Sequence, residues 1–266
     1  MKPVRTVLLG AALAACGDGG GFPDAPGIDS PSANGSFSMM WTIADTGAQV
    51  ISCDRVGAQS VTAILHERSH AGAFPEAFTC NSGMGSASLG PGIYDIQFEL
   101  RAPSGLLAMA AEQKGVVVMS GQTTALAPLA FTVDATGGLD LALDTNTTGG
   151  NCADTASGGA GITSMTITLE DAVDTCTPVT FAVSAGASGT AGTYVVDCAT
   201  PATIDCLHDD QRLTVTGVPS GNHQIHVRGN TATTSCWTND DSFAIPPLGA
   251  TLTRTLNLVE AMTGCN

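Results

Sequence analysis

Apolar and polar residues alternate along much of the chain after residue 36. A period of two places every second side chain on one face of a β-strand, so such runs predict strands with one buried face. Two openings show the pattern most clearly: Phe37, Met39, Trp41 and Ile43 in one, and Leu139, Leu141 and Leu143 in the other. Short alternating runs separated by turn residues predict an all-β protein.

The two openings begin two copies of one pattern. A cysteine follows each opening, Cys53 or Cys152, and then a β-branched run at 61–65 or 165–169. A second cysteine comes next, then a turn and another alternating strand. Each copy ends in a further alternating stretch. Its apolar residues are Leu126, Leu129, Phe131 and Val133 in the first copy and Leu252, Leu256 and Leu258 in the second. The repeat predicts two tandem Ig-like or transthyretin-like β-sandwich modules, at 36–134 and 135–266.

The turn inside each copy combines proline with glycine. Proline fixes φ and glycine accepts positive φ, so the chain reverses before the next strand. The first copy reads Gly-Pro-Gly-Ile-Tyr-Asp-Ile-Gln-Phe at 90–98, and in the second copy His223 stands where Tyr94 stands in the first. With the segment 116–124, this element resembles the carboxypeptidase regulatory-like modules, small transthyretin-like sandwiches of many exported bacterial proteins. Those modules carry no catalytic residues, so the resemblance implies a scaffold or binding role.

The first fifteen residues have the three zones of a secretory signal peptide. Lys2 and Arg5 precede an apolar run at 7–12, which is too short for the ~20 residues that span a bilayer, and small residues follow. The sequence Leu-Ala-Ala-Cys at 13–16 resembles the lipobox of bacterial lipoproteins. The resemblance implies cleavage before Cys16, lipid on its thiol and further acylation by a fatty acid such as palmitate. Two or three chains make a stable membrane anchor, where one would not.

Residues 16–35 are predicted to be the lipidated cysteine and a disordered linker. Glycine, proline and aspartate dominate 17–35, which cannot bury enough apolar surface to fold. As a flexible coil this segment would span about 25 Å. Residue 17 is glycine rather than aspartate, so the inner-membrane retention signal of enteric bacteria is absent, and the outer membrane is favoured over the inner membrane as the location in the cell envelope.

The composition limits the classes of partner that the protein can bind. After removal of the signal peptide, seven Lys and Arg stand against twenty-four Asp and Glu, a net charge of about −17. Binding to nucleic acid depends on neutralising phosphates with Lys and Arg, so nucleic acid is excluded as a partner. We expect contact with membrane lipid through the anchor and with an unknown envelope protein or glycan.

Nine cysteines are best counted as one lipidated residue and eight that form disulfides. Export to an oxidising compartment favours such bridges. Eight cysteines allow 105 connectivities, but the repeat suggests the same pair in each copy. The candidate bridges are Cys53 with Cys80 and Cys152 with Cys206, followed by Cys176 with Cys198 and Cys236 with Cys265.

One motif carries potential chemistry. His66, Glu67 and His70 match H-E-x-x-H, in which two histidines on one helical face bind zinc and the glutamate acts as general base. Here the motif follows a β-branched run, where a strand passes into a loop, and the second copy has Glu-Asp-Ala-Val at 170–173 instead. A third ligand would have to come from Glu76 or Glu99. A zinc-dependent hydrolase, or weak metal binding by this loop, is therefore the alternative to the leading interpretation.

The remaining candidates have simpler interpretations. Asp209-Asp210 and Asp240-Asp241 lack calcium-loop spacing, so solvated turns are favoured. His223 and His226 are three apart on a predicted strand and should face opposite sides. Of the tryptophans, Trp41 is expected in the core and Trp237 is left open. With no catalytic set and no cofactor expected, the sequence predicts a non-enzymatic envelope lipoprotein with a binding, adhesion or scaffold role. An inert structural spacer is a third possibility.

Overall fold

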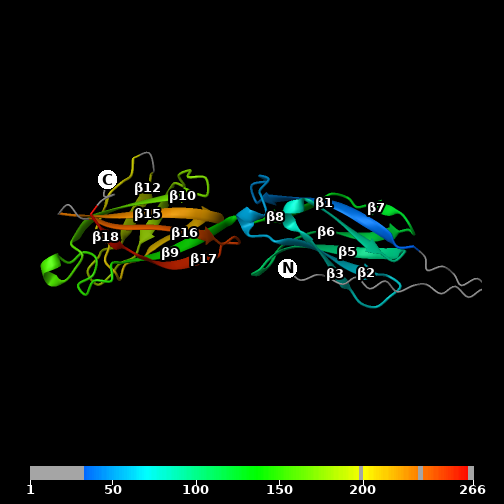
Figure 1. Ribbon diagram of the computed structural model, residues 1–266, viewed down its shortest axis with the longest axis horizontal. Helices are drawn as coiled ribbons and strands as arrows, with labels where there is room; N and C mark the ends of the chain where they lie inside the picture. Colours follow the sequence, from blue (N-terminus) through cyan, green and yellow to red (C-terminus); the bar gives the residue numbers. More distant parts are fainter. Residues whose placement is uncertain (1–32, 198–199, 233–235, 263–266) are drawn as a thin grey trace, which may run out of the picture. The chain divides into compact units, whose positions relative to one another are not determined.

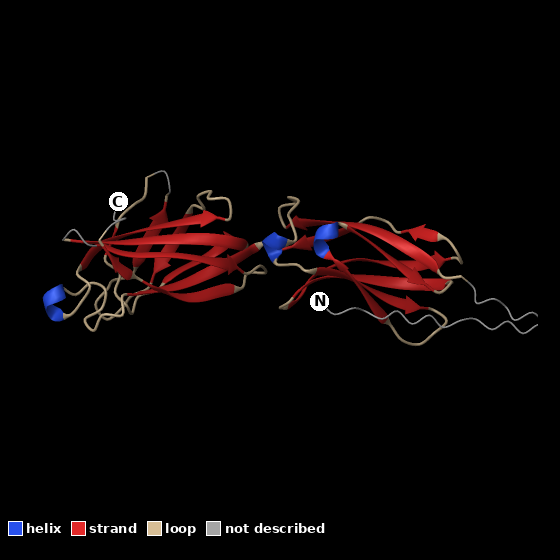
Figure 2. Cartoon of the chain, in the orientation of Figure 1, coloured by secondary structure: helices blue, strands red, loops and turns tan. Residues whose placement is uncertain are grey.

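The structure is a computed structural model that describes residues 33–197, 200–232 and 236–262 (Figure 1). Within these residues nearly all regular structure is β-strand, and the helices are short 3-10 turns (Figure 2). The three turns are η1 (Asp54–Val56), η2 (Cys80–Ser82) and η3 (Thr155–Ser157). The prediction of an all-β sandwich fold is confirmed.

Eight strands form what we call the first sandwich: β1 (Gly35–Asp45), β2 (Ser60–Glu67), β3 (Phe74–Thr79), β4 (Met84–Leu89), β5 (Gly92–Ala102), β6 (Gly105–Val118), β7 (Thr123–Ala125) and β8 (Leu129–Val133). One sheet has the order β4-β1-β7, with β8 also paired to β1, and the other has the order β3-β2-β5-β6. Strand β1 runs parallel to both β7 and β8. The first half of β1 therefore pairs with one strand and its second half with the other.

Ten strands form the second sandwich: β9 (Thr136–Asp144), β10 (Ile162–Asp171), β11 (Val179–Val183), β12 (Gly192–Val196), β13 (Ile204–Asp205), β14 (Leu213–Pro219), β15 (Gly221–Thr231), β16 (Cys236–Ile245), β17 (Thr251–Asn257) and β18 (Val259–Ala261). The sheets have the orders β13-β10-β15-β16-β18 and β12-β11-β14-β9-β17. Here too the last long strand, β17, lies parallel to the first, β9.

The buried apolar residues form two separate clusters. One contains residues between Phe37 and Ala135, and the other contains residues between Leu139 and Leu258. The alternating openings point into them: Phe37 and Leu139 are fully buried, and Trp41 belongs to the first core as expected. Two cores agree with two copies of one pattern, while the domain limits at 134 and 135 stay a prediction about which segments fold by themselves.

The repeat is visible in the hydrogen bonds of the turn before β5 and β15. Tyr94 pairs across the sheet with Glu67, and His223 pairs with Asp171. The Tyr94 hydroxyl donates to the carbonyl oxygen of Gly90 at 2.8 Å, and Nε2 of His223 bonds the carbonyl oxygen of Pro219 at 2.8 Å. Both bonds reach four residues back. The histidine therefore replaces the tyrosine in structure as well as in sequence, with Nε2 carrying the proton.

Candidate functional site

The H-E-x-x-H motif lies at the end of a strand and not on a helix. Strand β2 ends at Glu67, and its neighbour across the sheet is β5. Consecutive strand residues point to opposite faces, so the side chains of His66 and Glu67 diverge. Glu67 instead accepts a hydrogen bond from the Ser69 hydroxyl at 2.6 Å, and its second oxygen lies 3.0 Å from Nδ1 of His70. The carboxylate holds the following turn.

The arginine inside the motif also has a structural partner. Arg68 binds the Asp95 carboxylate through two nitrogens, with the shortest contact at 2.7 Å, and the backbone N–H of Gly115 donates to the same carboxylate at 2.7 Å. The Arg68 guanidinium and this N–H hold the pKa of Asp95 below its ordinary value. The Ser69 hydroxyl likewise lowers the pKa of Glu67. The motif's polar groups thus bind one another and the sheet.

This geometry does not support the zinc alternative. Among the described residues, no three His, Cys, Asp or Glu side chains lie together as metal ligands would. Glu99, one possible third ligand, instead binds Arg101 within β5 at 2.6 Å. Nor do Ser69, His70 and Glu67 form a catalytic relay, because Ser69 and Glu67 both contact the same nitrogen, Nδ1 of His70. A relay needs its two partners on opposite nitrogens of the imidazole ring.

The paired aspartates point to separate partners. Asp209 accepts from the backbone N–H of Asn151 at 2.8 Å, whereas Asp210 accepts from the backbone N–H of Ala187. Asp241 binds Arg254 at 2.6 Å. Each carboxylate fixes a loop or a strand edge, so neither pair forms a shared calcium site.

The two histidines of β15 face opposite sides, as expected. His223 is 3% exposed and points into the second sandwich, whereas His226 lies on the outer face. There Nδ1 of His226 is 2.6 Å from Asp240 and Nε2 is 3.7 Å from Glu170. Arg228 contacts the same Asp240 carboxylate at 2.9 Å. These groups form a solvent-facing ionic cluster across β10, β15 and β16.

The predicted bridges of the repeat are present. Cys53 is bonded to Cys80, and Cys152 is bonded to Cys206. Both pairings suggested by the repeat are therefore confirmed. Cys176 and Cys236 are also disulfide-bonded, while Cys198 and Cys265, their expected partners, lie outside the described residues, as does the lipidation candidate Cys16.

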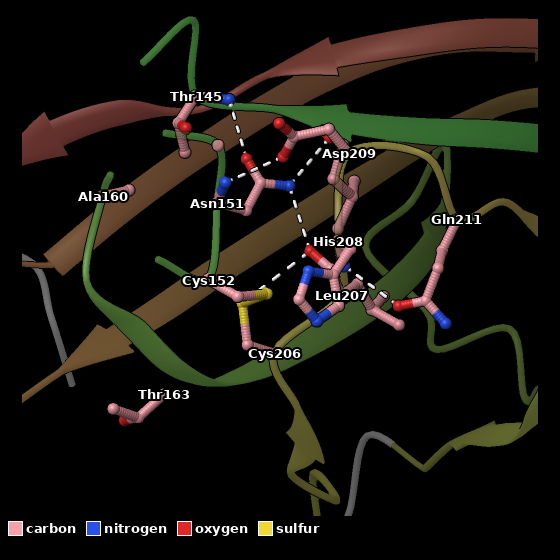
Figure 3. The surroundings of a disulfide bond; sticks show 12 residues. Thr145, Asn151, Cys152, Ala160, Thr163, Cys206, Leu207, His208, Asp209 and Gln211 are labelled. Atoms are coloured by element: carbon pink, nitrogen blue, oxygen red, sulfur yellow. Dashed lines mark hydrogen bonds between the residues drawn. A yellow bond between two sulfur atoms is a disulfide. The ribbon is translucent and has the colours of Figure 1, made fainter. Parts of the chain in front are cut away.

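The second bridge organises the loop end of the second sandwich (Figure 3). Beside it lies Asn151, only 1% exposed, whose side chain makes three hydrogen bonds. Its Oδ1 accepts from the N–H of Thr145 at 3.0 Å, and its Nδ2 donates to the carbonyls of Leu143 at 2.9 Å and Leu207 at 3.1 Å. One side chain thus joins the end of β9, the Gly-rich loop at 145–161 and the segment after Cys206. Sequence reasoning missed it; the only hint is its place directly before a bridging cysteine.

Two hollows flank this bridge. Cys206 lines one hollow together with His208 and Gln211, and Cys152 lines the other together with Ala160 and Thr163. In Figure 3, Gln211 lies on one side of the disulfide and Ala160 and Thr163 lie on the other. In the first hollow the side chain of Gln211 is fully engaged: its Nε2 donates to two carbonyls, at 3.1 and 3.0 Å, and its Oε1 accepts from the N–H of His208 at 3.0 Å. The second hollow is lined by two carboxylates, Asp154 and Glu260, and by Trp237.

Comparisons with known proteins indicate folds only. No protein-family model matches the chain, and no curated protein matches it. Among solved structures it is similar to the TIE protein of Bacillus anthracis, with 14% identity and a TM-score of 0.34 over 85% of this chain. It is also similar to the major pilin of Streptococcus pyogenes, with 10% identity and a TM-score of 0.32, covering 85% of this chain and 98% of the pilin.

A shaft pilin, SpaA of Lactobacillus rhamnosus GG, is similar at 7% identity and a TM-score of 0.28, over 85% of this chain and 98% of the pilin. The chain spans 34% of the TIE protein's length. At these identities and TM-scores the neighbours carry no argument about activity, and no enzyme family is indicated. In the part of the chain that the structure describes, no helix is long and apolar enough to cross a membrane.

Proposed function

We propose that this protein is a lipid-anchored lipoprotein of the bacterial cell envelope with a non-enzymatic binding, adhesion or scaffold role. The observation that carries the proposal is the use of its cysteines. All six cysteines within the described residues are disulfide-bonded, which suits an exported chain in an oxidising compartment. Cys198 and Cys265 then complete an even set of eight, and Cys16 is the odd cysteine of the lipobox-like sequence.

The binding or scaffold role follows from what the polar side chains do. The motif at 66–70 and the paired aspartates stabilise turns and loops, so the side chains with potential chemistry have structural partners. The turn shared by Tyr94 and His223 supports the repeat, and the resemblance of its sequence to carboxypeptidase regulatory-like modules implies the same role. The outer membrane is favoured because residue 17 is glycine.

Fatty-acid labelling tests the anchor. Cells expressing the full chain are fed an alkyne-modified palmitate, and label on the protein is compared between the natural sequence and Cys16→Ser. We expect the label to be lost in Cys16→Ser and kept in a control variant that lacks another cysteine pair, Cys53→Ala with Cys80→Ala. Label that persists in Cys16→Ser would exclude lipidation at this residue.

Two further measurements test the location and the role. Density-gradient separation of membranes should place the natural protein with the outer membrane, and Cys16→Ser should leave the membrane fractions. Cross-linking in intact cells should join the protein to a defined envelope component. A protein that is lipidated but joins no component would favour the inert spacer instead.

A further inference from the structure

The hollow beside Cys152 has the chemistry of a ligand site. It has a volume of about 450 Å³, within the ~300 to 1,000 Å³ usual for small-molecule sites. Its wall combines one tryptophan, two carboxylates and several threonines, among them Trp237, Asp154, Glu260 and Thr163. It lies wholly on the second sandwich, between η3, the start of β10, the end of β15 and the strands β16 and β18.

Trp237 is held in a fixed position. Its indole Nε1 donates to the carbonyl oxygen of Ala160 at 3.1 Å, and the ring packs against the second core while it remains partly exposed in the hollow. Its neighbour on β15 is Gly229, and the buried side chain of Ile162 fills the space that a side chain at Gly229 would take. A rigid, partly exposed indole provides a flat apolar surface with little entropy to lose on binding.

The charged groups around the indole are carboxylates, which only accept hydrogen bonds when ionised. Glu260 is the direct neighbour of Trp237 across β16 and β18. Asp154 caps η3 by accepting from the N–H of Ser157 at 2.7 Å, and these bonds to Ser157 hold its pKa below the ordinary value. The hydroxyl of Thr163 already donates to the carbonyl of Asn230 at 3.1 Å, so its oxygen is left to accept. The hollow therefore suits a ligand with several donors.

The charge of the wall further limits the chemical class of the ligand. No Lys, Arg or His is among the described residues that line the hollow, so a sulfated, phosphorylated or uronic acid ligand would meet only repulsion. A neutral sugar matches the wall on two counts. Its ring presents a face of C–H groups that can cover the indole, and its hydroxyls donate to carboxylates.

We infer that this hollow is a binding site for a neutral saccharide, which stacks on Trp237 and donates hydroxyl hydrogen bonds to Glu260 and Asp154. The inference deepens the proposed function, because it names a glycan as the class of partner. It rests on that proposal for the location of the protein in the cell envelope. We expect carbohydrate binding at the second sandwich and not at the first. The tryptophan of the first sandwich, Trp41, is buried in the core and offers no exposed ring to a ligand.

Titration of sugars into the full chain tests the inference, in a polyoxyethylene detergent that carries no sugar headgroup. The probes are cellohexaose, maltohexaose and chitohexaose as neutral sugars, trigalacturonate as an acidic sugar and choline chloride as a cation. Calorimetry gives the affinity. Tryptophan fluorescence in a Trp41→Phe background reports on Trp237 alone, since the chain has two tryptophans.

We expect at least one neutral hexasaccharide to bind and to change the Trp237 emission. Trp237→Ala should weaken that binding by about tenfold or more, because stacked aromatic anchors dominate such sites, and Glu260→Gln by about threefold to tenfold. Trp41→Phe is the matched control and should leave the affinity unchanged. If Trp237→Ala disturbs packing, as circular dichroism would show, Trp237→Phe keeps an aromatic face and should retain most of the binding.

Several results would overturn the inference. These are no binding of any neutral probe up to about 10 mM, equal binding of trigalacturonate, binding of choline in place of the sugars, or an affinity insensitive to Trp237→Ala in a folded protein. None of these bears on fatty-acid labelling at Cys16, which decides the proposed anchor by itself. Conversely, sugar binding without labelling would support the site and refute the lipoprotein.

Discussion

Replacing Asn151 by alanine should destabilise the second sandwich strongly. Asn151 is 1% exposed, and the substitution removes the three hydrogen bonds of its side chain. Two backbone carbonyls and one backbone N–H then lose their partner in a buried place. A buried backbone group without a partner costs about 1 to 3 kcal/mol. Some relaxation and water entry will reduce the sum, so we expect a loss of about 3 to 5 kcal/mol in the free energy of unfolding.

Urea denaturation measures this loss. In a Trp41→Phe background the remaining tryptophan, Trp237, reports on the second sandwich. A urea dependence of about 2 kcal/mol per molar converts the expected loss into a midpoint lower by about 2 M. The control is Asn257→Ala, on an exposed position of β17 in the same sandwich, which should change stability by less than about 0.5 kcal/mol.

A second substitution separates the hydrogen bonds from the shape of the site. Asn151→Asp keeps an oxygen to accept from Thr145 but can no longer donate to both carbonyls, and at neutral pH it places a charge in a buried position. Burial disfavours the ionised form, so this variant should be less stable at pH 7 than at pH 4 relative to the natural protein. A loss below about 1 kcal/mol for Asn151→Ala, or a loss equal to that of Asn257→Ala, would refute the role assigned to this residue.

Three other measurements check the structural assignments. Removing the bridge between Cys53 and Cys80, which closes 27 residues, should cost about 3.5 kcal/mol by the chain-entropy relation, and unchanged urea denaturation would contradict it. Arg68→Gln should lower the melting temperature at pH 7, and the difference should disappear in acid once Asp95 is protonated in the folded protein, because Asp95, whose pKa is lowered, stabilises the fold only while ionised; a pH-independent difference would mean that the ion pair is not the cause. Metal analysis of the purified chain should give no stoichiometric zinc, and one zinc per chain would restore the hydrolase alternative.

The repetitive part of the fold could be predicted from the sequence. Strands with one buried face carry a period of two, so β1, β2, β5, β9 and β10 are evident from their residues. The bridges between equivalent cysteines were also predictable, because equivalent positions in a repeat occupy equivalent places in the structure. Both kinds of inference depend on a pattern that recurs, and each succeeded where the pattern was strong.

Other strands give no such pattern. The first part of β6, Gly105–Val118, is rich in alanine and long polar residues and does not alternate, yet it pairs along β5 with three shifts of register. Strand β3 contains Pro75, which argues against a strand in general but is accepted at the edge of the sheet, where β3 lies. Parallel pairing of β1 with β7 and β8 depends on contacts between distant segments, and no local pattern encodes it.

Single polar residues at the site were beyond sequence reasoning for a different reason. Asn151 sits in a loop rich in glycine and threonine, where asparagine is common, and only the carbonyls that surround it reveal its burial. Trp237 could be either a core residue or a ligand platform. Its bond to Ala160 and the hollow beside it decide the question, and both depend on the folded chain.

The two copies differ most in the length of chain between their bridging cysteines. The bridging cysteines are 27 residues apart in the first copy and 54 in the second, so the second copy holds more chain between equivalent points of one frame. Doubling the length of a loop adds only about 0.6 kcal/mol to the entropic cost of closing it, so the longer interval costs little. Most of this added chain lies between the end of β10 and Cys206, where it forms β11, β12 and β13, whereas η3 follows Cys152 just as η1 follows Cys53. We place the binding role in the second copy because, of the two tryptophans, Trp41 is buried in the first core whereas Trp237 lines the hollow beside Cys152.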